Sequence, residues 1–153
     1  MNIDIVDDES GLREVYTAVI ERAGFTVNSF ARAGEYMAYT NSHILPPPSI
    51  AVITDVKMPG KSGYELMEDV QKVNPKQRFV VVTGSPQEER KGDANACFYL
   101  QKPVSIKKLV SVIKLLSACS VAGDQHLASS CELLSDLRAF SVDDWSCPHI
   151  KSC

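Results

Sequence analysis

The sequence predicts an α/β domain with a parallel β-sheet covered by helices on both faces. Short runs of β-prone apolar residues alternate with amphipathic stretches along most of the chain. Such alternation is typical of parallel strands joined by helical crossovers. The 153 residues, 44% hydrophobic and 23% charged, are close to the average of soluble globular proteins, so the chain can bury a core without disulfides or metals.

The elements follow from the spacing of the apolar residues. Five apolar runs predict strands at 2–6, 25–30, 50–54, 79–82 and 97–100. Helical spacing predicts helices at 10–23, 33–40, 64–73 and 105–117, with Gly24 ending the first and Pro75 following the third. The residues expected to face inward from three of these helices are Leu12, Val15, Tyr16, Val19, Ile20, Leu66, Met67, Val70, Ile106, Leu109, Val112, Ile113 and Leu116.

The segment between the fourth and fifth strands is unusual for such a domain. Residues 85–96 read SPQEERKGDANA, which contains no large apolar side chain and is interrupted by Gly92. A regular helix at this place would bury Leu, Ile or Val against the sheet. The segment is therefore predicted to form a shortened or irregular fourth helix, displaced or partly disordered.

The charge distribution predicts a domain boundary. Residues 1–118 hold 14 acidic and 14 basic side chains, whereas residues 119–153 hold 5 acidic and 2 basic ones and so supply the whole net charge of −3. We predict a domain over 1–118 and a C-terminal extension over 119–153, with one short helix and an irregular tail. Ser129 and Glu132 match the capping-box pattern expected at the beginning of that helix. Its apolar residues, Leu133, Leu134, Leu137 and Phe140, favour an additional helix that is packed or frayed. A helix that binds a partner or forms a dimer is the alternative.

Charge and composition also exclude several classes of function. A net charge of −3 argues against direct nucleic-acid binding, which needs a basic face. No apolar run approaches the length of a membrane span, and Asp4, Asp7 and Asp8 occupy the place of a signal-peptide core. A cytoplasmic protein is expected.

The five cysteines are an odd number, so a disulfide framework is not expected in a reducing compartment. A zinc site made of Cys131, Cys147, His149 and Cys153 is disfavoured, because the spacing matches no common finger. Free thiols are the simpler interpretation.

Polar residues gather where the predicted strands end. These strand ends carry Asp7 and Asp8, Asp55, Thr83, and Lys102. The carboxyl ends of parallel strands share one edge of the sheet, which is where ligands bind in such folds. Three crowded carboxylates repel one another and favour a cation, and their oxygens suit Mg²⁺.

The same residues suit phosphoryl chemistry. A carboxylate such as Asp55 can act as a nucleophile and form an aspartyl-phosphate. The added negative charge would be neutralised by the metal, by Lys102 and by the Thr83 hydroxyl. Taken alone, Asp7 and Asp8 could simply begin a helix and Lys102 could be a solvated lysine. Agreement among independent strand ends favours a phosphoryl site.

Four motifs follow the predicted strands in order: IVDDES, ITDVKMPGKSG, VVVTG and LQKPV. With these motifs residues 1–117 resemble the receiver domain of two-component response regulators. The resemblance implies a flavodoxin-like, doubly wound five-stranded parallel sheet in the order 2-1-3-4-5. It also implies that Asp55 accepts a phosphoryl group from a sensor histidine kinase or a phosphotransfer protein, and that a downstream partner reads the change.

The resemblance further implies individual roles. Asp8, Asp55 and the backbone carbonyl of Lys57 would bind Mg²⁺, and Asp7 would act mostly through water. Thr83 and Lys102 would bind phosphoryl oxygens. Tyr99 would be the aromatic switch residue that turns inward as Thr83 moves. The protein would catalyse only its own phosphorylation and dephosphorylation. A dimer stays open as the alternative role of the helix in the C-terminal extension.

Two alternatives remain. The chain could be a receiver-like interaction module that works without phosphorylation, which the irregular 85–96 segment keeps open. It could also be a Mg²⁺-dependent phosphohydrolase with Asp55 as nucleophile. Such enzymes usually carry a second acid two residues after the nucleophile, and here that position holds Lys57.

Overall fold

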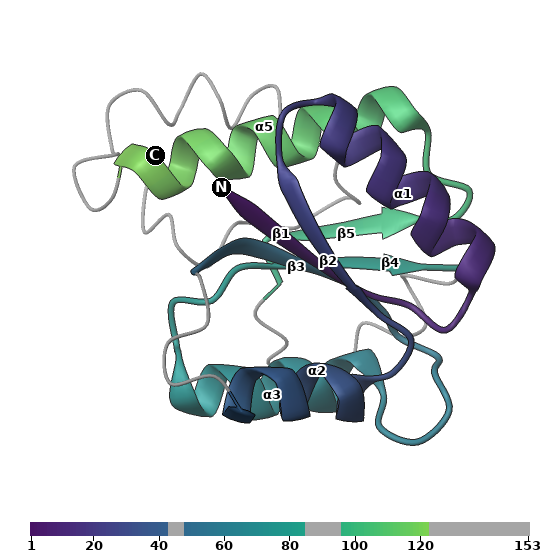
Figure 1. Ribbon diagram of the computed structural model, residues 1–153, viewed down its shortest axis with the longest axis vertical. Coiled ribbons are helices and arrows are strands. Elements are labelled where there is room, and N and C mark those ends of the chain that lie inside the picture. Colours follow the sequence, from purple (N-terminus) through teal and green to yellow (C-terminus); the bar gives the residue numbers. More distant parts are fainter. Residues whose placement is uncertain (43–47, 85–95, 123–153) are drawn as a thin grey trace.

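Five parallel strands form one sheet in the order β2-β1-β3-β4-β5 (Figure 1). The structure is a computed structural model that describes residues 1–42, 48–84 and 96–122. The strands are β1 (Asn2–Val6), β2 (Thr26–Phe30), β3 (Ser49–Asp55), β4 (Phe79–Thr83) and β5 (Phe98–Gln101). The predicted doubly wound, flavodoxin-like sheet is confirmed.

Helices cover both faces of this sheet. Helices α1 (Ser10–Arg22) and α5 (Ile106–Ala122) lie on one face, and α2 (Ala33–Ser42) and α3 (Gly63–Val73) lie on the other (Figure 1). None of the helices in the described part of the chain is long and apolar enough to cross a membrane. The predicted irregular fourth helix falls in residues 85–95, outside the described residues, as do the predicted short helix of the extension and the disfavoured zinc ligands.

The apolar strands divide the core into two clusters, one on each face. Along β4, Val80 and Val82 pack with the cluster under α1 and α5, while Phe79 and Val81 pack with the cluster under α2 and α3. Alternate strand residues point to opposite faces, so a strand buried on both sides needs a continuous apolar run. This requirement explains why β4 reads FVVVT and is buried throughout.

Two residues expected to face inward are exposed instead. Val15 on α1 is 47% exposed and Ile106 at the start of α5 is 56% exposed. Tyr16 and Ile20, one turn apart, form the buried line of α1. Val15 precedes Tyr16 by one residue and is therefore turned by about 100° away from it. The predicted apolar stripe was too wide on this helix and too long at the beginning of α5.

The helix ends differ slightly from the prediction. Helix α1 ends at Arg22, and Gly24 follows with φ of 99°, a backbone conformation that favours glycine. Helix α5 runs to Ala122, five residues past its predicted end, because no helix breaker occurs before Gly123. It thus crosses the boundary predicted between residues 118 and 119, and the division into two parts stays a prediction.

Candidate functional site

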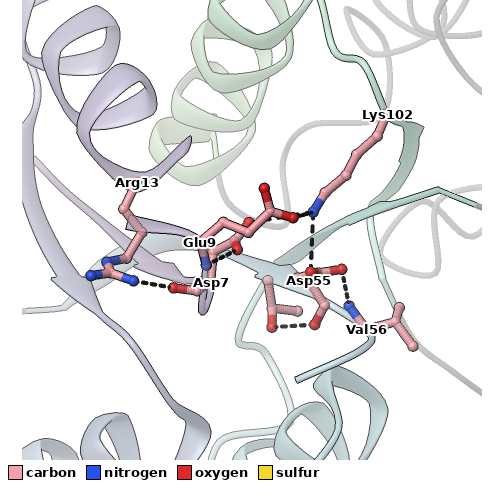
Figure 2. Close-up of polar contacts among 7 residues, drawn as sticks. Asp7, Glu9, Arg13, Asp55, Val56 and Lys102 are labelled. Atoms are coloured by element: carbon pink, nitrogen blue, oxygen red, sulfur yellow. Dashed lines mark hydrogen bonds and ion pairs between the residues drawn. The ribbon is translucent and has the colours of Figure 1, made fainter. Parts of the chain in front are cut away.

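The ends of four strands meet at one edge of the sheet and bring the predicted site residues together. Asp7 follows β1, Asp55 ends β3, Thr83 ends β4 and Lys102 follows β5. The backbone N–H of Lys102 donates to the Thr83 carbonyl oxygen at 2.8 Å, which extends the β4–β5 pairing by one residue. Side chains that are far apart in the sequence therefore converge, as Figure 2 shows for Asp7, Asp55 and Lys102.

Three carboxylates form an acidic cluster at this edge. Asp7, Asp8 and Asp55 each offer an oxygen atom, and these atoms all lie within 4.8 Å of one another. Asp7 and Asp55 are buried, whereas Asp8 is exposed. Burial raises the pKa of Asp7 above its ordinary value, and the nearby charge of Asp55 adds to this effect. An all-oxygen set with mutual repulsion fits a hard divalent cation.

Lys102 supplies the positive charge that faces this cluster. Its Nζ lies 3.1 Å from Asp55 Oδ2, 3.5 Å from Glu9 Oε1 and 3.7 Å from Asp7 Oδ2 (Figure 2). Burial by itself would lower the pKa of Lys102, but the hydrogen bond to Asp55 and the three negative charges outweigh it and raise that pKa. The side chain is therefore an ammonium ion at neutral pH.

Asp55 is oriented by its neighbours in the chain. The Val56 backbone N–H donates to Asp55 Oδ1 at 2.7 Å, which leaves Oδ2 toward Lys102 (Figure 2). The Thr54 hydroxyl donates to the Asp55 carbonyl oxygen at 2.9 Å. Gly63, the first residue of α3, donates its N–H to the Val56 carbonyl oxygen at 3.0 Å. Both the carboxylate and the backbone of Asp55 are thus held in place.

The turn after β3 contains Pro59 and Gly60. Gly60 follows Pro59 directly and has φ of 81°, a backbone conformation that residues with a side chain rarely adopt. Lys57 is exposed in this turn. The role of its backbone carbonyl as a metal ligand stays a prediction.

The two predicted switch residues are both buried. Thr83 is 1% exposed and Tyr99 is 2% exposed. Tyr99 pairs with Val81 across the β4–β5 ladder, and its ring belongs to the core cluster under α2 and α3. The ring thus lies inside the domain in this structure, and its role as a switch stays a prediction.

Two residues of the site were missed by reasoning from the sequence. Glu9 reaches Lys102, although its position directly after Asp8 reads as the beginning of a helix. Gly63 packs on Asp55, and its only sequence signal is its place in the ITDVKMPGKSG motif. Neither contact is visible before the strands are placed beside one another.

Comparison with known proteins identifies relatives of this chain. Residues 3–114 match the family model of the response regulator receiver domain. The chain is 31% identical over 145 residues to the response regulator Rre1 of Synechocystis, which covers 88% of this chain and 61% of that protein. It is 30% identical over 112 residues to the C4-dicarboxylate transport transcriptional regulatory protein DctD of Rhizobium meliloti, which covers 71% of this chain and 24% of that protein. The chain thus spans only part of these relatives.

Solved structures show the same fold. A CheY-like response regulator receiver domain protein from Methanospirillum hungatei superposes with a TM-score of 0.66 at 27% identity, covering 80% of this chain and 98% of that one. The response regulator TrrA from Thermotoga maritima, solved in complex with Mg²⁺ and BeF, superposes with a TM-score of 0.65 at 24% identity, covering 75% and 97%.

Proposed function

This chain belongs to the response regulator receiver domain family, and on that premise we propose that Asp55 accepts a phosphoryl group from a phosphohistidine of a partner protein. The observation that carries the proposal is the position of Lys102, whose Nζ lies 3.1 Å from Asp55 Oδ2 beside a cluster of three carboxylates. An ammonium ion held beside this carboxylate can neutralise the charge of the incoming phosphoryl oxygens.

The transfer is a displacement at phosphorus. A carboxylate oxygen of Asp55 forms a bond to phosphorus, and the bond from phosphorus to the histidine nitrogen breaks with its electron pair going to the imidazole. The N–H of Val56 on Asp55 Oδ1 holds the carboxylate in one orientation during this step. Lys102 would neutralise charge on a phosphoryl oxygen, and the hydroxyl of Thr83 would bind another.

The acidic cluster supports a Mg²⁺ site. Asp8, Asp55 and the Lys57 carbonyl would hold the ion directly and Asp7 would hold it through water. When bound, Mg²⁺ would offset the negative charge that the phosphoryl group brings to three carboxylates. Asp8 is the exposed member of the cluster, so an ion and a phosphodonor would reach the site from its side.

Signal output would begin at the same residues. Thr83 ends β4, and Tyr99 lies on β5, its neighbour in the sheet. We propose that movement of Thr83 toward the phosphoryl group changes the packing of Tyr99, so that a downstream partner distinguishes the two states.

The proposed phosphodonor is a sensor histidine kinase or a phosphotransfer protein. One relative is named as the sensor kinase CckA of Brucella abortus, which is 29% identical to this chain over 113 residues. Other relatives are named as transcriptional regulatory proteins and are longer than this chain, so the expected absence of nucleic-acid binding is not carried into the proposal. A cytoplasmic location and a dimer stay predictions.

The test is an intact-mass measurement after incubation with Mg²⁺ and acetyl phosphate. The wild-type chain should gain one phosphate, and Asp55→Asn should gain none. Failure of the wild type to form an adduct or to bind beryllofluoride would favour the non-phosphorylated interaction module. Rapid multiple turnover of phosphoesters would favour the hydrolase, and either result would overturn the proposal.

A further inference from the structure

We propose that Glu9 is a positioning residue for Lys102: its carboxylate holds the ammonium group before phosphoryl transfer, which strengthens binding of the divalent cation and opposes binding of the phosphoryl group. The inference rests on the proposed function of Asp55, because it concerns the reaction at that residue. Its starting point is the 3.5 Å distance between Glu9 Oε1 and Lys102 Nζ, which joins residues 93 positions apart.

The side chain of Glu9 does not cap the helix that it precedes. Glu9 is the N-cap residue of α1, with extended backbone at φ of −80° and ψ of 104°, yet its side chain makes no capping hydrogen bond. Its backbone N–H donates instead to Asp7 Oδ1 at 2.9 Å. The carboxylate extends across the edge of the sheet toward Lys102, as Figure 2 shows. A Ser, Thr or Asp would cap this helix better, so the Glu side chain calls for another explanation.

The three carboxylates around the ammonium group differ in how firmly they are held. Asp55 accepts from the Val56 N–H, and Asp7 accepts from the Glu9 N–H, so both are fixed by the backbone. The side chain of Glu9 is 60% exposed and reaches Lys102 from the rim of the site. An ammonium group has three donors, and three carboxylates surround it here. Hydrogen bonds join Lys102 to Asp55 at 3.1 Å and to Glu9 at 3.5 Å, whereas Asp7 at 3.7 Å is an ion-pair partner. A phosphoryl oxygen that binds Lys102 competes with these carboxylates for the ammonium group, and Glu9 is the carboxylate most able to move away.

The charge of Glu9 acts in opposite directions on the two ligands of the site. A fourth negative charge beside Asp7, Asp8 and Asp55 attracts a divalent cation. The same charge repels an anionic phosphoryl group and competes with it for Lys102. Because the side chain is largely exposed, water screens both effects, and each should amount to a change in affinity of about two- to fivefold.

A purely structural role of Glu9 makes a different prediction. An acidic residue at the N-terminus of α1 would favour the helix through its dipole. Losing that stabilisation would loosen the segment that carries Asp7 and Asp8, and both ligands would then bind more weakly. The sign of the two changes therefore separates the positioning role from a structural one.

The experiment measures two affinities on the unphosphorylated full chain. Titration calorimetry gives the Mg²⁺ dissociation constant, and a second titration at saturating Mg²⁺ gives the dissociation constant of beryllofluoride, a phosphoryl mimic. The chains compared are wild type, Glu9→Gln, the charge-conserving Glu9→Asp and the matched control Glu14→Gln. Glu14 is an exposed acidic residue on α1 that has no part in the proposed site.

Glu9→Gln should weaken Mg²⁺ binding and tighten beryllofluoride binding, each by about two- to fivefold, with Glu14→Gln unchanged. Glu9→Asp should keep Mg²⁺ affinity within about twofold of wild type, since the charge remains. Unchanged affinities in Glu9→Gln, or two changes in the same direction, would overturn the positioning role while wild-type binding of both ligands still supported the proposed function. A wild-type chain that bound no beryllofluoride would overturn both.

Discussion

Gly63 packs so closely on Asp55 that a β-carbon at this position would overlap the Asp55 carbonyl oxygen. The same β-carbon would lie 3.1 Å from the Thr54 hydroxyl oxygen, which itself donates to that carbonyl. The first residue of α3 therefore touches the backbone of the proposed phosphoacceptor. Only glycine allows this approach, so the helix position and the Asp55 position depend on each other.

Gly63→Ala should lower the free energy of unfolding by about 1–3 kcal/mol, because backbone must move to admit the methyl group. It should also slow phosphorylation at Asp55. Urea denaturation measures the first effect and intact mass with acetyl phosphate the second. The matched control is Gly34→Ala on α2, where no atom lies within 4 Å of the added carbon. That change should stabilise the chain by about 0.5–1 kcal/mol, and a Gly63→Ala chain as stable as wild type would contradict the packing described.

Lys102→Met should bind Mg²⁺ more tightly than wild type, although it should retain phosphate poorly. Removing the ammonium group leaves the carboxylates of Asp7 and Asp55 without the cation 3.7 Å and 3.1 Å away, so a divalent ion meets more uncompensated charge. Calorimetric Mg²⁺ titration checks the affinity. Lys108→Met on α5 controls for the loss of one positive charge from the chain. Weaker Mg²⁺ binding in Lys102→Met, with the control unchanged, would show that Lys102 does not oppose the cation.

Asp4 should make the stability of the fold depend on pH. Its buried carboxylate accepts from Asn28 Nδ2 at 3.0 Å and from the Tyr36 hydroxyl at 3.2 Å, and burial raises its pKa above 3.8. The folded state therefore favours the protonated form. The stability from this group is complete below the unfolded pKa and is lost as the pH rises through the higher folded pKa.

Asp4→Asn keeps the shape and cannot ionise. The free energy of unfolding of wild type should therefore fall relative to that of Asp4→Asn as the pH is raised from about 4, the ordinary pKa of an aspartate, toward neutrality. Urea denaturation across this range measures the difference. Asp69→Asn is a control of opposite sign, because its hydrogen bond with Lys61 lowers the pKa of Asp69. The free energy of unfolding of wild type should fall relative to that of Asp69→Asn as the pH falls. A constant difference between Asp4→Asn and wild type would argue that Asp4 does not ionise within this range.

A chain that ends at Ala122 should unfold with the free energy of the full chain. Among the α5 residues whose side chains the structure describes, the buried ones are Leu109, Val112, Ile113 and Leu116. Urea denaturation of residues 1–122 tests whether residues 123–153 contribute to the stability of the domain. A chain that ends at Ser111 lacks three of these core residues and should not fold. A clear loss of stability in the chain that ends at Ala122 would place part of residues 123–153 in the fold.

The sequence by itself determined the type and order of the elements and named most residues of the candidate site. Parallel strands end at a common edge, so polar residues after apolar runs predicted that Asp7, Asp8, Asp55, Thr83 and Lys102 would meet. The sheet order came from the resemblance of four motifs to a known family, and the structure confirms it. The element types and the residues at the strand ends are local or repeat along the chain, and for that reason they can be predicted from the sequence.

The tertiary structure alone decided which of these groups touch and which others join them. The pairing of Glu9 with Lys102 and the fit of Gly63 on Asp55 depend on distances between separate elements. Helical and strand periodicity give the direction in which a side chain points but not what lies opposite. The same limit explains why Val15 fitted an apolar stripe and is nevertheless exposed. Packing between elements, which no local pattern records, assigns the final contacts.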